Sequence, residues 1–255
     1  RRSKGLVPNA ASMTAVSGEG EGDMGGELPD NSGHSPLPTC PPTVHQSMGP
    51  LPTSFFDRPT VQVAQDLLGQ HLIHDHPEAG RLVGRIVETE AYTEDDPACH
   101  ASHLSRDPDT GEISGQGRGK DLFAAPGTAY VYLIYGMHWL LNVVTEPEGT
   151  AGAVLIRAVE PMFGIEFMRQ TRGVQRDIDL TNGPGKLTDA FGVGGDFHEA
   201  DLTEPPLYLA EGEMVAGQQV ASSSRIGISK GVKRHWRWFL VENPYVSRAT
   251  PSDQR

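Results

Sequence analysis

The sequence predicts an α+β fold with an antiparallel sheet, preceded by a disordered tail. Strand-like segments follow one another through short turns, which is typical of antiparallel pairing. Apolar residues recur at helical spacing in two other segments, 59–69 and 161–172. The first 52 residues, in contrast, contain no aromatic residue and no isoleucine.

The composition indicates that only part of the chain folds. Its hydrophobic content of 37% and aromatic content of 7% are low for a chain of 255 residues. Residues 1–52 are rich in Gly, Pro, Ser and Thr, and they cannot bury enough apolar surface to offset the entropy of ordering. We therefore predict a disordered tail at 1–52, a folded domain at 53–249 and a C-terminal tail at 250–255.

Charge and cysteine content restrict the classes of partner and compartment. The formal net charge of −12 argues against a polyanionic partner for the surface as a whole, although a local basic patch can still bind phosphate. The two cysteines, Cys40 and Cys99, form no disulfide framework and no Cys-based zinc site. We expect an intracellular, reducing compartment. No apolar run approaches ~18 residues, so no membrane partner is expected.

Local residue patterns predict the elements in order. A helix is expected over 59–69, because Pro59 suits a first helical turn and Gly69 closes the end. Strands are expected where β-branched and apolar residues dominate between Gly- and Pro-containing turns. These strands cover 71–74, 82–92, 128–135, 140–144, 153–159 and 207–209. Two more helices are predicted, at 161–172 and 187–191.

The stretch R-I-V-E-T-E-A-Y, residues 85–92, carries the strongest chemical signal. Alternation along a strand places Ile86, Glu88, Glu90 and Tyr92 on one face. Neighbouring carboxylates raise one another's proton affinity, which suits a general base. A buried strand could not hold both acids without partners. The alternative is an edge strand whose acids are simply solvated.

The long polar loop at 94–119 contains a second candidate. His100 and His103 are spaced H-x-x-H, beside Glu94, Asp95 and Asp96, and such a set could bind a metal ion. The spacing is diagnostic only on a helix, and this loop has no helical periodicity. Ordinary polar loop residues are the alternative.

Aromatic residues concentrate on the strand that follows. Tyr130 and Tyr132 share one face, and Tyr135 lies at the strand end beside Gly136, where its side chain can protrude.

Basic residues form two candidate phosphate contacts in an acidic chain. Lys186 follows the turn 179–185, whose backbone N–H groups could hold a phosphate, or which could simply cap a helix. Near the C-terminus, basic residues alternate with His235, Trp236 and Trp238, which suggests a phosphate-facing patch rather than a merely solvated face. This basic cluster comprises Arg225, Lys230, Lys233, Arg234 and Arg237.

Six motifs in order resemble the alkyladenine (3-methyladenine) DNA glycosylase family across residues 54–248. They are R-I-V-E-T-E-A-Y at 85–92, A-x-H at 98–100, P-G-T-A-Y-V-Y-L-I-Y-G-M-H at 126–138, Asn142, L-I-R-A-V-E-P at 155–161 and L-T-N-G-P-G-K-L at 180–187. The resemblance implies a single α+β domain around a curved antiparallel sheet with surrounding helices. It also implies a monomeric base-excision repair enzyme without metal or other cofactor.

The activity implied by the resemblance is hydrolysis of the N-glycosidic bond of alkylated or deaminated purines flipped out of double-stranded DNA. Such purines include 3-methyladenine, 7-methylguanine, hypoxanthine and ethenoadenine, and the compartment would be a bacterial cytoplasm or a nucleus. Catalysis would depend on Glu90 as general base and on Arg157, which helps to place the water. The remaining roles fall to Tyr92, His100 and Tyr132 as pocket walls, Asn142 at the pocket floor against guanine, and Tyr135 as the wedge in the duplex.

Chemistry agrees with this expectation. Alkylated purines carry positive charge, which aromatic faces attract by ~0.5–2 kcal/mol each. No lysine falls inside the pocket motifs, so we expect simple hydrolysis without a Schiff base. The candidate DNA backbone contacts are Lys186, Arg225, Lys230, Lys233 and Arg234.

Three other functions remain open from the residues. A metal-dependent hydrolase would use His100 and His103 with the acids of 93–96. A damage sensor without catalysis would not need the pairing of Glu90 with Arg157. An acyl- or formyl-transfer enzyme could use the same carboxylates, but it gives no reason for a protruding Tyr135.

Overall fold

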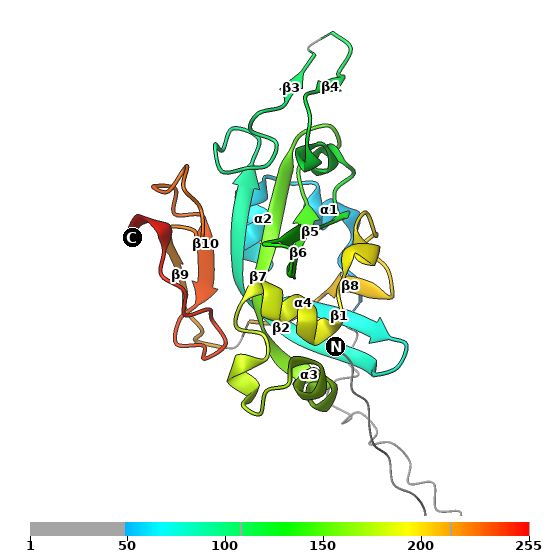
Figure 1. Cartoon of the computed structure of the whole chain (residues 1–255), viewed down its shortest axis with the longest axis vertical. Helices are drawn as coiled ribbons and strands as arrows, with labels where there is room; N and C mark the ends of the chain where they lie inside the picture. Colours follow the sequence, from blue (N-terminus) through cyan, green and yellow to red (C-terminus); the bar gives the residue numbers. More distant parts are fainter. Residues whose placement is uncertain (1–48, 108, 215, 255) are drawn as a thin grey trace, which may run out of the picture. The chain divides into compact units, whose positions relative to one another are not determined.

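Two long strands, β2 (Gly80–Thr93) and β7 (Gly152–Phe163), form the centre of the fold (Figure 1). The computed structural model describes residues 49–107, 109–214 and 216–254, all within one compact unit, His45–Arg255. Strand β7 pairs with β2 from Val83 to Thr93. The other edge of β2 is shared, because β1 (His71–His76) pairs with its first half and β10 (Arg237–Leu240) with its second half.

The main sheet is antiparallel throughout its described pairs, which confirms the predicted α+β architecture. Its strands run in the order β5-β6-β7-β2-β1-β8, and β9 extends the sheet beyond β10. The additional strands are β5 (Ala129–Ile134), β6 (His138–Val144), β8 (Leu207–Ala210) and β9 (Val220–Ser223). The loop predicted at 94–119 also holds a short hairpin, β3 (Ser105–Arg106) with β4 (Ile113–Ser114).

The helices are few and short. They are α1 (Thr53–Phe56), α2 (Thr60–Asp66), α3 (Ile165–Arg172) and α4 (Pro184–Phe191), with 3-10 turns η2 (Arg118–Phe123), η3 (Asp177–Asp179), η4 (Gly195–Phe197) and η5 (Ser252–Gln254). The prediction that α3 begins at Pro161 is wrong, because Pro161 still pairs with β2. The chain turns only at Gly164, whose φ of 80° favours glycine.

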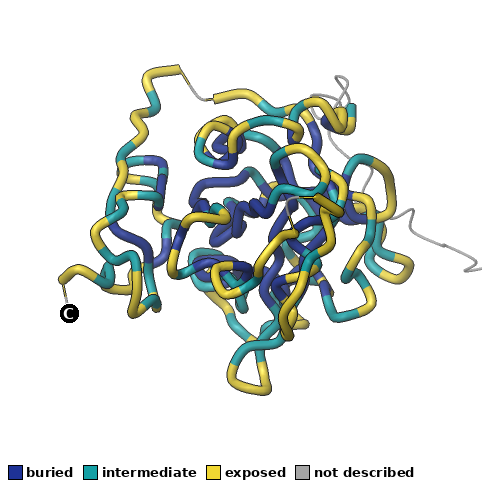
Figure 2. The backbone as a smooth tube through the Cα atoms, turned by 90° about the horizontal axis from the view of Figure 1, so that it is seen from above, coloured by how far each residue is buried: buried dark blue, intermediate teal, exposed yellow. Residues whose placement is uncertain are grey.

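One apolar cluster holds the helices against the sheet. Val63 of α2, Val87 of β2 and Phe191 of α4 all belong to it and are fully buried. The buried segments gather in the interior, and the loops around them are exposed (Figure 2). Each large apolar side chain so buried contributes about 1.5–3 kcal/mol to folding. The sheet thereby becomes a rigid support for the side chains that it carries.

Three irregularities interrupt the pairing of β2 with β7, and two of them flank Glu88. From Ile86 to Glu88 the partner advances by only one residue, so Val87 is the extra residue of a bulge. One step later, the partner moves from Ala158 to Ile156, which makes Arg157 the extra residue on β7. Bulges re-aim side chains and break strict alternation. Ile86 accordingly lies in the main core cluster with Val87, and its predicted place beside Glu88 is wrong.

The folded part extends beyond the predicted domain limits at both ends. Leu51 is only 4% exposed, and its N–H donates to Leu209 O, so it belongs to the core rather than to a tail. At the other end, residues 252–254 form η5, and Asp253 accepts a hydrogen bond from Ser224. Residues 1–48 of the predicted tail lie outside the described residues.

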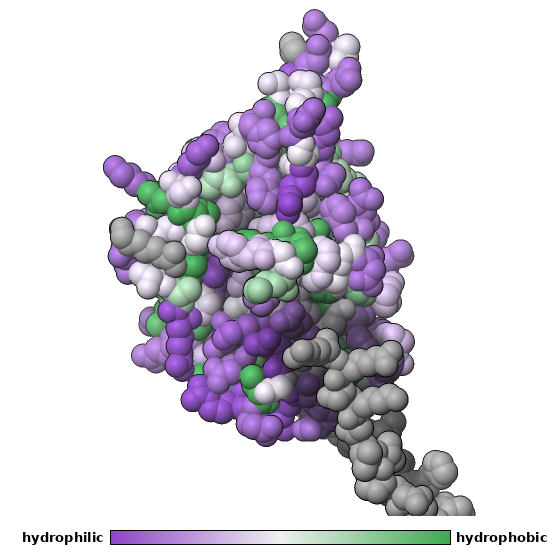
Figure 3. All heavy atoms as spheres, in the orientation of Figure 1, coloured by the Kyte–Doolittle hydropathy of each residue, from purple (hydrophilic) through white to green (hydrophobic). Residues whose placement is uncertain are grey.

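The surface seen in Figure 3 is mostly polar, with apolar residues in small separate patches. Within the described ranges, no helix has the length and apolar character needed to cross a membrane.

A shortened chain tests where the folded part begins. A chain that starts at Thr53 loses the buried Leu51 and the bridge from Pro50 to Ala210. Loss of a buried leucine side chain destabilises a protein by about 2–5 kcal/mol, so we expect a lower free energy of unfolding by that amount. Urea denaturation measures it, with a chain that starts at Gly49 as the control. Equal stability of the two chains would show that residues 49–52 belong to the tail and not to the folded part.

Candidate active site

Strands β2, β7 and β10 bring two carboxylates and two guanidinium groups together inside the protein. This acid–arginine cluster consists of Glu88 and Glu90 on β2, Arg157 on β7 and Arg237 on β10. The side chains of both glutamates are 0% exposed, and those of the arginines are 6% and 5% exposed. A buried carboxylate is strongly disfavoured without a partner, so the two arginines are required for the strand to be buried here.

Glu88 is fixed by donors on every side. Its Oε1 accepts hydrogen bonds from Arg157 Nε at 2.8 Å, Arg237 Nε at 2.6 Å and Ser247 Oγ at 2.7 Å. Its Oε2 accepts from the Ser247 N–H at 2.7 Å. Burial raises the pKa of Glu88, but the charges of Arg157 and Arg237 and these hydrogen bonds outweigh burial and lower it. Glu88 therefore stays ionised and anchors both arginines.

Glu90 has fewer partners and lies closer to open space. Its Oε1 accepts the N–H of Ile226 at 2.7 Å, and its Oε2 accepts the Tyr92 hydroxyl at 2.8 Å. Arg157 Nη1 lies 3.2 Å from the same Oε2. A carboxylate offers about four lone-pair sites. These three donors among the described residues leave about one site for a proton donor such as water.

The partners of Glu90 keep their protons. Burial, followed by the charge of Glu90, raises the pKa of Tyr92 well above its ordinary value, so its hydroxyl remains a donor. Burial lowers the pKa of Arg157, but the charges of Glu90 and Glu88 outweigh it and raise the pKa above the ordinary arginine value. The carboxylate of Glu90 is thus the acceptor of this group.

A cavity of about 660 Å³ opens directly beside the cluster. Tyr92, His100, Tyr132, Asn142 and Arg157 all line it, so the structure brings together five of the residues that the resemblance assigned to one site. Glu90 is not among the lining residues. It contacts two of them, Tyr92 and Arg157, and so lies immediately behind the cavity wall.

Aromatic rings form one wall of the cavity. Tyr132 lies 4.8 Å from His100 and 5.3 Å from Tyr130, measured between ring centroids. His100 Nδ1 is 2.7 Å from the Tyr130 hydroxyl, which fixes the imidazole. Burial, with Arg118 and His103 nearby, lowers the pKa of His100, so the ring is neutral near pH 7. Burial raises the pKa of Tyr132 to about 12. The wall therefore offers uncharged π faces.

Asn142 on β6 is 3% exposed and points into the cavity region between β5 and β7. Its Nδ2 donates to Tyr130 O at 3.0 Å. This bond fixes the amide, so the side chain presents a defined polar group to whatever enters.

Tyr135 stands at the rim of the cavity on the β5–β6 hairpin. It is 83% exposed, and its neighbour Met137 is 68% exposed. The φ of Tyr135 is 53°, a left-handed conformation that is uncommon for residues other than glycine and costs of order 1–3 kcal/mol. The hairpin thus holds a large ring in solvent at a cost in stability, and this feature points to a binding partner.

The basic residues near the C-terminus divide into two groups. The predicted backbone contact by Arg225 is wrong, because its side chain is 0% exposed and is paired with Asp96. Arg237 is likewise buried, in the acid–arginine cluster. Lys230 and Lys233 are exposed, and Lys230 lines the cavity. The other two candidates are half-buried and have partners, Lys186 with Asn182 and Arg234 with Asp95.

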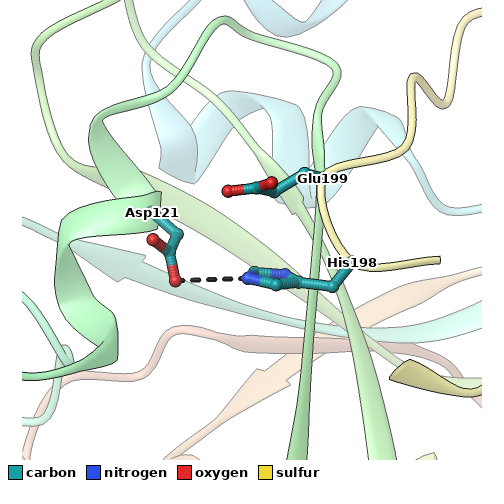
Figure 4. A group of neighbouring side chains, drawn as sticks. All are labelled: Asp121, His198 and Glu199. Atoms are coloured by element: carbon teal, nitrogen blue, oxygen red, sulfur yellow. Dashed lines mark ion pairs between the residues drawn. The ribbon is translucent and has the colours of Figure 1, made fainter. Parts of the chain in front are cut away.

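The H-x-x-H pair does not assemble a metal site in this structure. His100 Nδ1 is bound to Tyr130, and His103 Nε2 is 2.8 Å from Gln116 O. Over the described ranges, the grouping compact enough to surround an ion is a different one, Asp121, His198 and Glu199 (Figure 4).

The hydrogen bonds of His198 favour a different role for that grouping. His198 Nδ1 accepts the N–H of Val131 at 3.3 Å, which leaves the proton of a neutral ring on Nε2, facing Asp121 Oδ2 at 3.3 Å. That nitrogen then has no lone pair for an ion. The ring instead packs against Tyr130, with 5.8 Å between centroids, and supports the aromatic wall.

Several residues of the cavity and of the acid–arginine cluster's surroundings carried no signal in the sequence. Arg118 lies over the Tyr132 ring at 5.5 Å, but it occurs in a loop without periodicity. Ile226 acts through its main-chain N–H, which any residue could supply. Ser247 contacts Glu88 across 159 positions of the chain, a pairing that only the fold reveals.

Substitution Glu88→Gln tests the anchoring role by stability. Removing one charge of a buried network costs about 3–5 kcal/mol at neutral pH. Because the pKa of Glu88 is lowered by folding, its stabilisation is present above the unfolded pKa of about 4.3 and is lost as pH falls through the folded pKa. We therefore expect the difference in free energy of unfolding between wild type and variant to shrink at about pH 3, measured by urea denaturation.

The control is Glu166→Gln, since Glu166 forms an exposed i,i+3 pair with Arg169. Such pairs contribute about 0–1 kcal/mol. If Glu88→Gln lowers the free energy of unfolding by no more than Glu166→Gln does, the anchoring role is contradicted.

Comparison with known proteins adds independent evidence. The sequence profile of the family described as Methylpurine-DNA glycosylase matches residues 54–244. A relative from Salinibacter ruber is 72% identical over 205 residues, which cover 80% of this chain and 100% of the relative. A second, from Prosthecochloris aestuarii, is 46% identical and covers 80% and 94%. Both carry the provisional name 3-methyladenine DNA glycosylase. The chain therefore belongs to the methylpurine-DNA glycosylase family, as the six motifs indicated.

Proposed function

We propose that this protein hydrolyses the N-glycosidic bond of alkylated or deaminated purines in double-stranded DNA. One observation carries the proposal: a buried carboxylate, Glu90, lies behind an aromatic cavity whose rim holds the exposed Tyr135. The names of the relatives support the class of substrate. The candidate substrates are 3-methyladenine, 7-methylguanine, hypoxanthine and ethenoadenine.

The damaged nucleotide must leave the duplex, since C1′ is not accessible inside the base stack. Tyr135 would enter the duplex and occupy the space of the flipped base. Its side chain is already exposed on the β5–β6 hairpin before DNA binds. The extruded base would then lie between Tyr92 on one side and His100 and Tyr132 on the other. Stacking on such rings is worth about 1–3 kcal/mol per base.

The reaction requires one proton acceptor. Glu90 accepts a proton from a water molecule as the water oxygen bonds to C1′, and the bond from C1′ to the base nitrogen breaks with its electron pair going to the base. Arg157 positions Glu90 and reaches the cavity surface, where it can orient the water. Glu88 holds Arg157 in turn. A base that already carries positive charge leaves as a neutral molecule and needs no acid, whereas a neutral purine such as hypoxanthine leaves as an anion that then takes a proton from water.

Specificity against normal guanine fits Asn142. Its amide is fixed by Tyr130, so a base with an additional exocyclic amino group would meet a side chain that cannot move aside.

Binding to DNA would depend on basic residues at the surface. Lys230, which lines the cavity, and Lys233 are both exposed, and with Lys186 and Arg234 they are candidates for phosphate contacts. The enzyme would act as a monomer, in a compartment that contains DNA, without a metal ion or other cofactor. Its reaction would stop at the abasic site, without a Schiff base.

Substitution Glu90→Gln tests the mechanism. The amide keeps the shape of the side chain but cannot accept the proton, so single-turnover excision from a duplex with hypoxanthine should fall by at least ~10²–10⁴-fold. Affinity for that duplex should stay equal or increase, because a negative charge near a polyanion has been removed. Alkaline treatment of the product should be needed for strand cleavage if no Schiff base forms.

The matched control is Glu88→Gln, compared per folded molecule. We expect a smaller loss of rate, because Glu88 acts through the arginines. If the Glu90 variant excises at a near-normal rate and the Glu88 variant is inactive, Glu90 is not the general base.

Substitution Tyr135→Ser tests base flipping. The variant should lose more excision from double-stranded than from single-stranded substrate, because a wedge replaces stacking only where a stack exists. Met137→Ser, on the same exposed hairpin, is the comparison. Equal losses on both substrates would show that Tyr135 contributes in another way.

A further inference from the structure

A buried ion pair lies behind the wall that Tyr92 provides. Arg225 Nη2 donates to Asp96 Oδ1 at 3.0 Å, Nη1 donates to Asp96 Oδ2, and both side chains are 0% exposed. The Arg225 Cζ atom lies 4.6 Å from the centroid of the Tyr92 ring. Arg225 is absent from the cavity lining, whereas Tyr92 is part of it. The ring thus separates the guanidinium from the cavity.

The structure is built closely around this pair. Arg225 Nη1 also donates to Ala91 O at 2.8 Å, next to Tyr92 in the chain. At Gly231, a Cβ atom would lie 2.6 Å from Asp96 Oδ1, and φ is 62°, so glycine is required for both space and conformation. Ala91 and Gly231 therefore both pack against the Arg225–Asp96 pair, which argues for a fixed charge arrangement rather than a surface contact.

The position of the pair matters because of the charge of a bound base. A purine stacked on the open side of Tyr92 lies about 4.5–7 Å from that ring. The guanidinium is then roughly 10 Å from the base, on the other side of the ring. At that distance, a bare positive charge would repel a cationic purine but not a neutral one. Asp96 compensates this charge.

We propose that the Asp96–Arg225 pair sets the balance between positively charged and neutral purines in the cavity. The inference rests on the proposed function. Arg225 fixes the Tyr92 ring from behind, and Asp96 cancels the field that Arg225 would otherwise project through it. Both are positioning residues, since neither reaches the cavity. The acid–arginine cluster is a separate source of charge, with two acids and two arginines that balance each other.

The test compares one cationic lesion with one neutral lesion. Single-turnover excision of 7-methylguanine and of hypoxanthine is measured in the same duplex, and the ratio of the two rates is followed. Asp96→Asn leaves the arginine uncompensated, so the ratio should fall by about ten-fold. Arg225→Gln leaves the aspartate uncompensated, so the ratio should rise by a similar factor. The double variant has neither charge, and its ratio should return to the wild-type value.

The control is Asp177→Asn, which breaks a comparable two-bonded pair with Arg169 outside the cavity lining. Its ratio should equal that of the wild type. A purely structural role would lower both rates together and leave the ratio unchanged in all variants, which would overturn the proposal. If one single variant fails to fold, the other and the double variant still give opposed expectations. If the wild type excises neither lesion, the proposed function fails instead.

Discussion

The burial of two carboxylates on one strand is the constraint on which the site depends. Glu88 and Glu90 are separated by a single residue and neither is exposed, so each must be compensated by charge and hydrogen bonds within the protein. Arg157 contacts both acids and Arg237 contacts Glu88. The bulge that makes Arg157 an extra residue of β7 places its guanidinium between them. The sheet irregularity is therefore part of the site's electrostatics.

The two acids have different roles because their surroundings differ. Glu88 accepts four strong hydrogen bonds and is enclosed by protein, whereas Glu90 accepts fewer and adjoins a cavity lined by neutral rings. Identical side chains on one strand thus occupy two different positions, one enclosed by hydrogen-bond donors and one beside the cavity. His100 is neutral and the tyrosines are protonated, so the charged side chains that line or adjoin the cavity in the described part of the chain are Arg118, Arg157, Lys230 and Glu90.

Much of this arrangement could be predicted from the sequence, and the remainder could not for physical reasons. Periodicity located β2 and β5, and the alternation of Glu88, Glu90 and Tyr92 gave the correct face for three of four residues. The bulge at Val87 moved Ile86 to the core, since an added residue has no signature in a pattern of period two. The prediction that Arg225 of the basic cluster contacts DNA was wrong for a related reason. Arg225 and Lys230 look alike in sequence, and only the buried Asp96 distinguishes them.

The division of one edge of β2 between β1 and β10 affects how the protein is made. Strand β1 precedes β2 in the chain, but β10 follows it by more than a hundred positions, and Ser247 lies 159 residues beyond Glu88. During synthesis, Arg237 and Ser247 leave the ribosome after Glu88 and Arg157. Until then the newly made chain holds Glu88 without two of its partners, so this half of the sheet becomes stable only after Ser247 has been made.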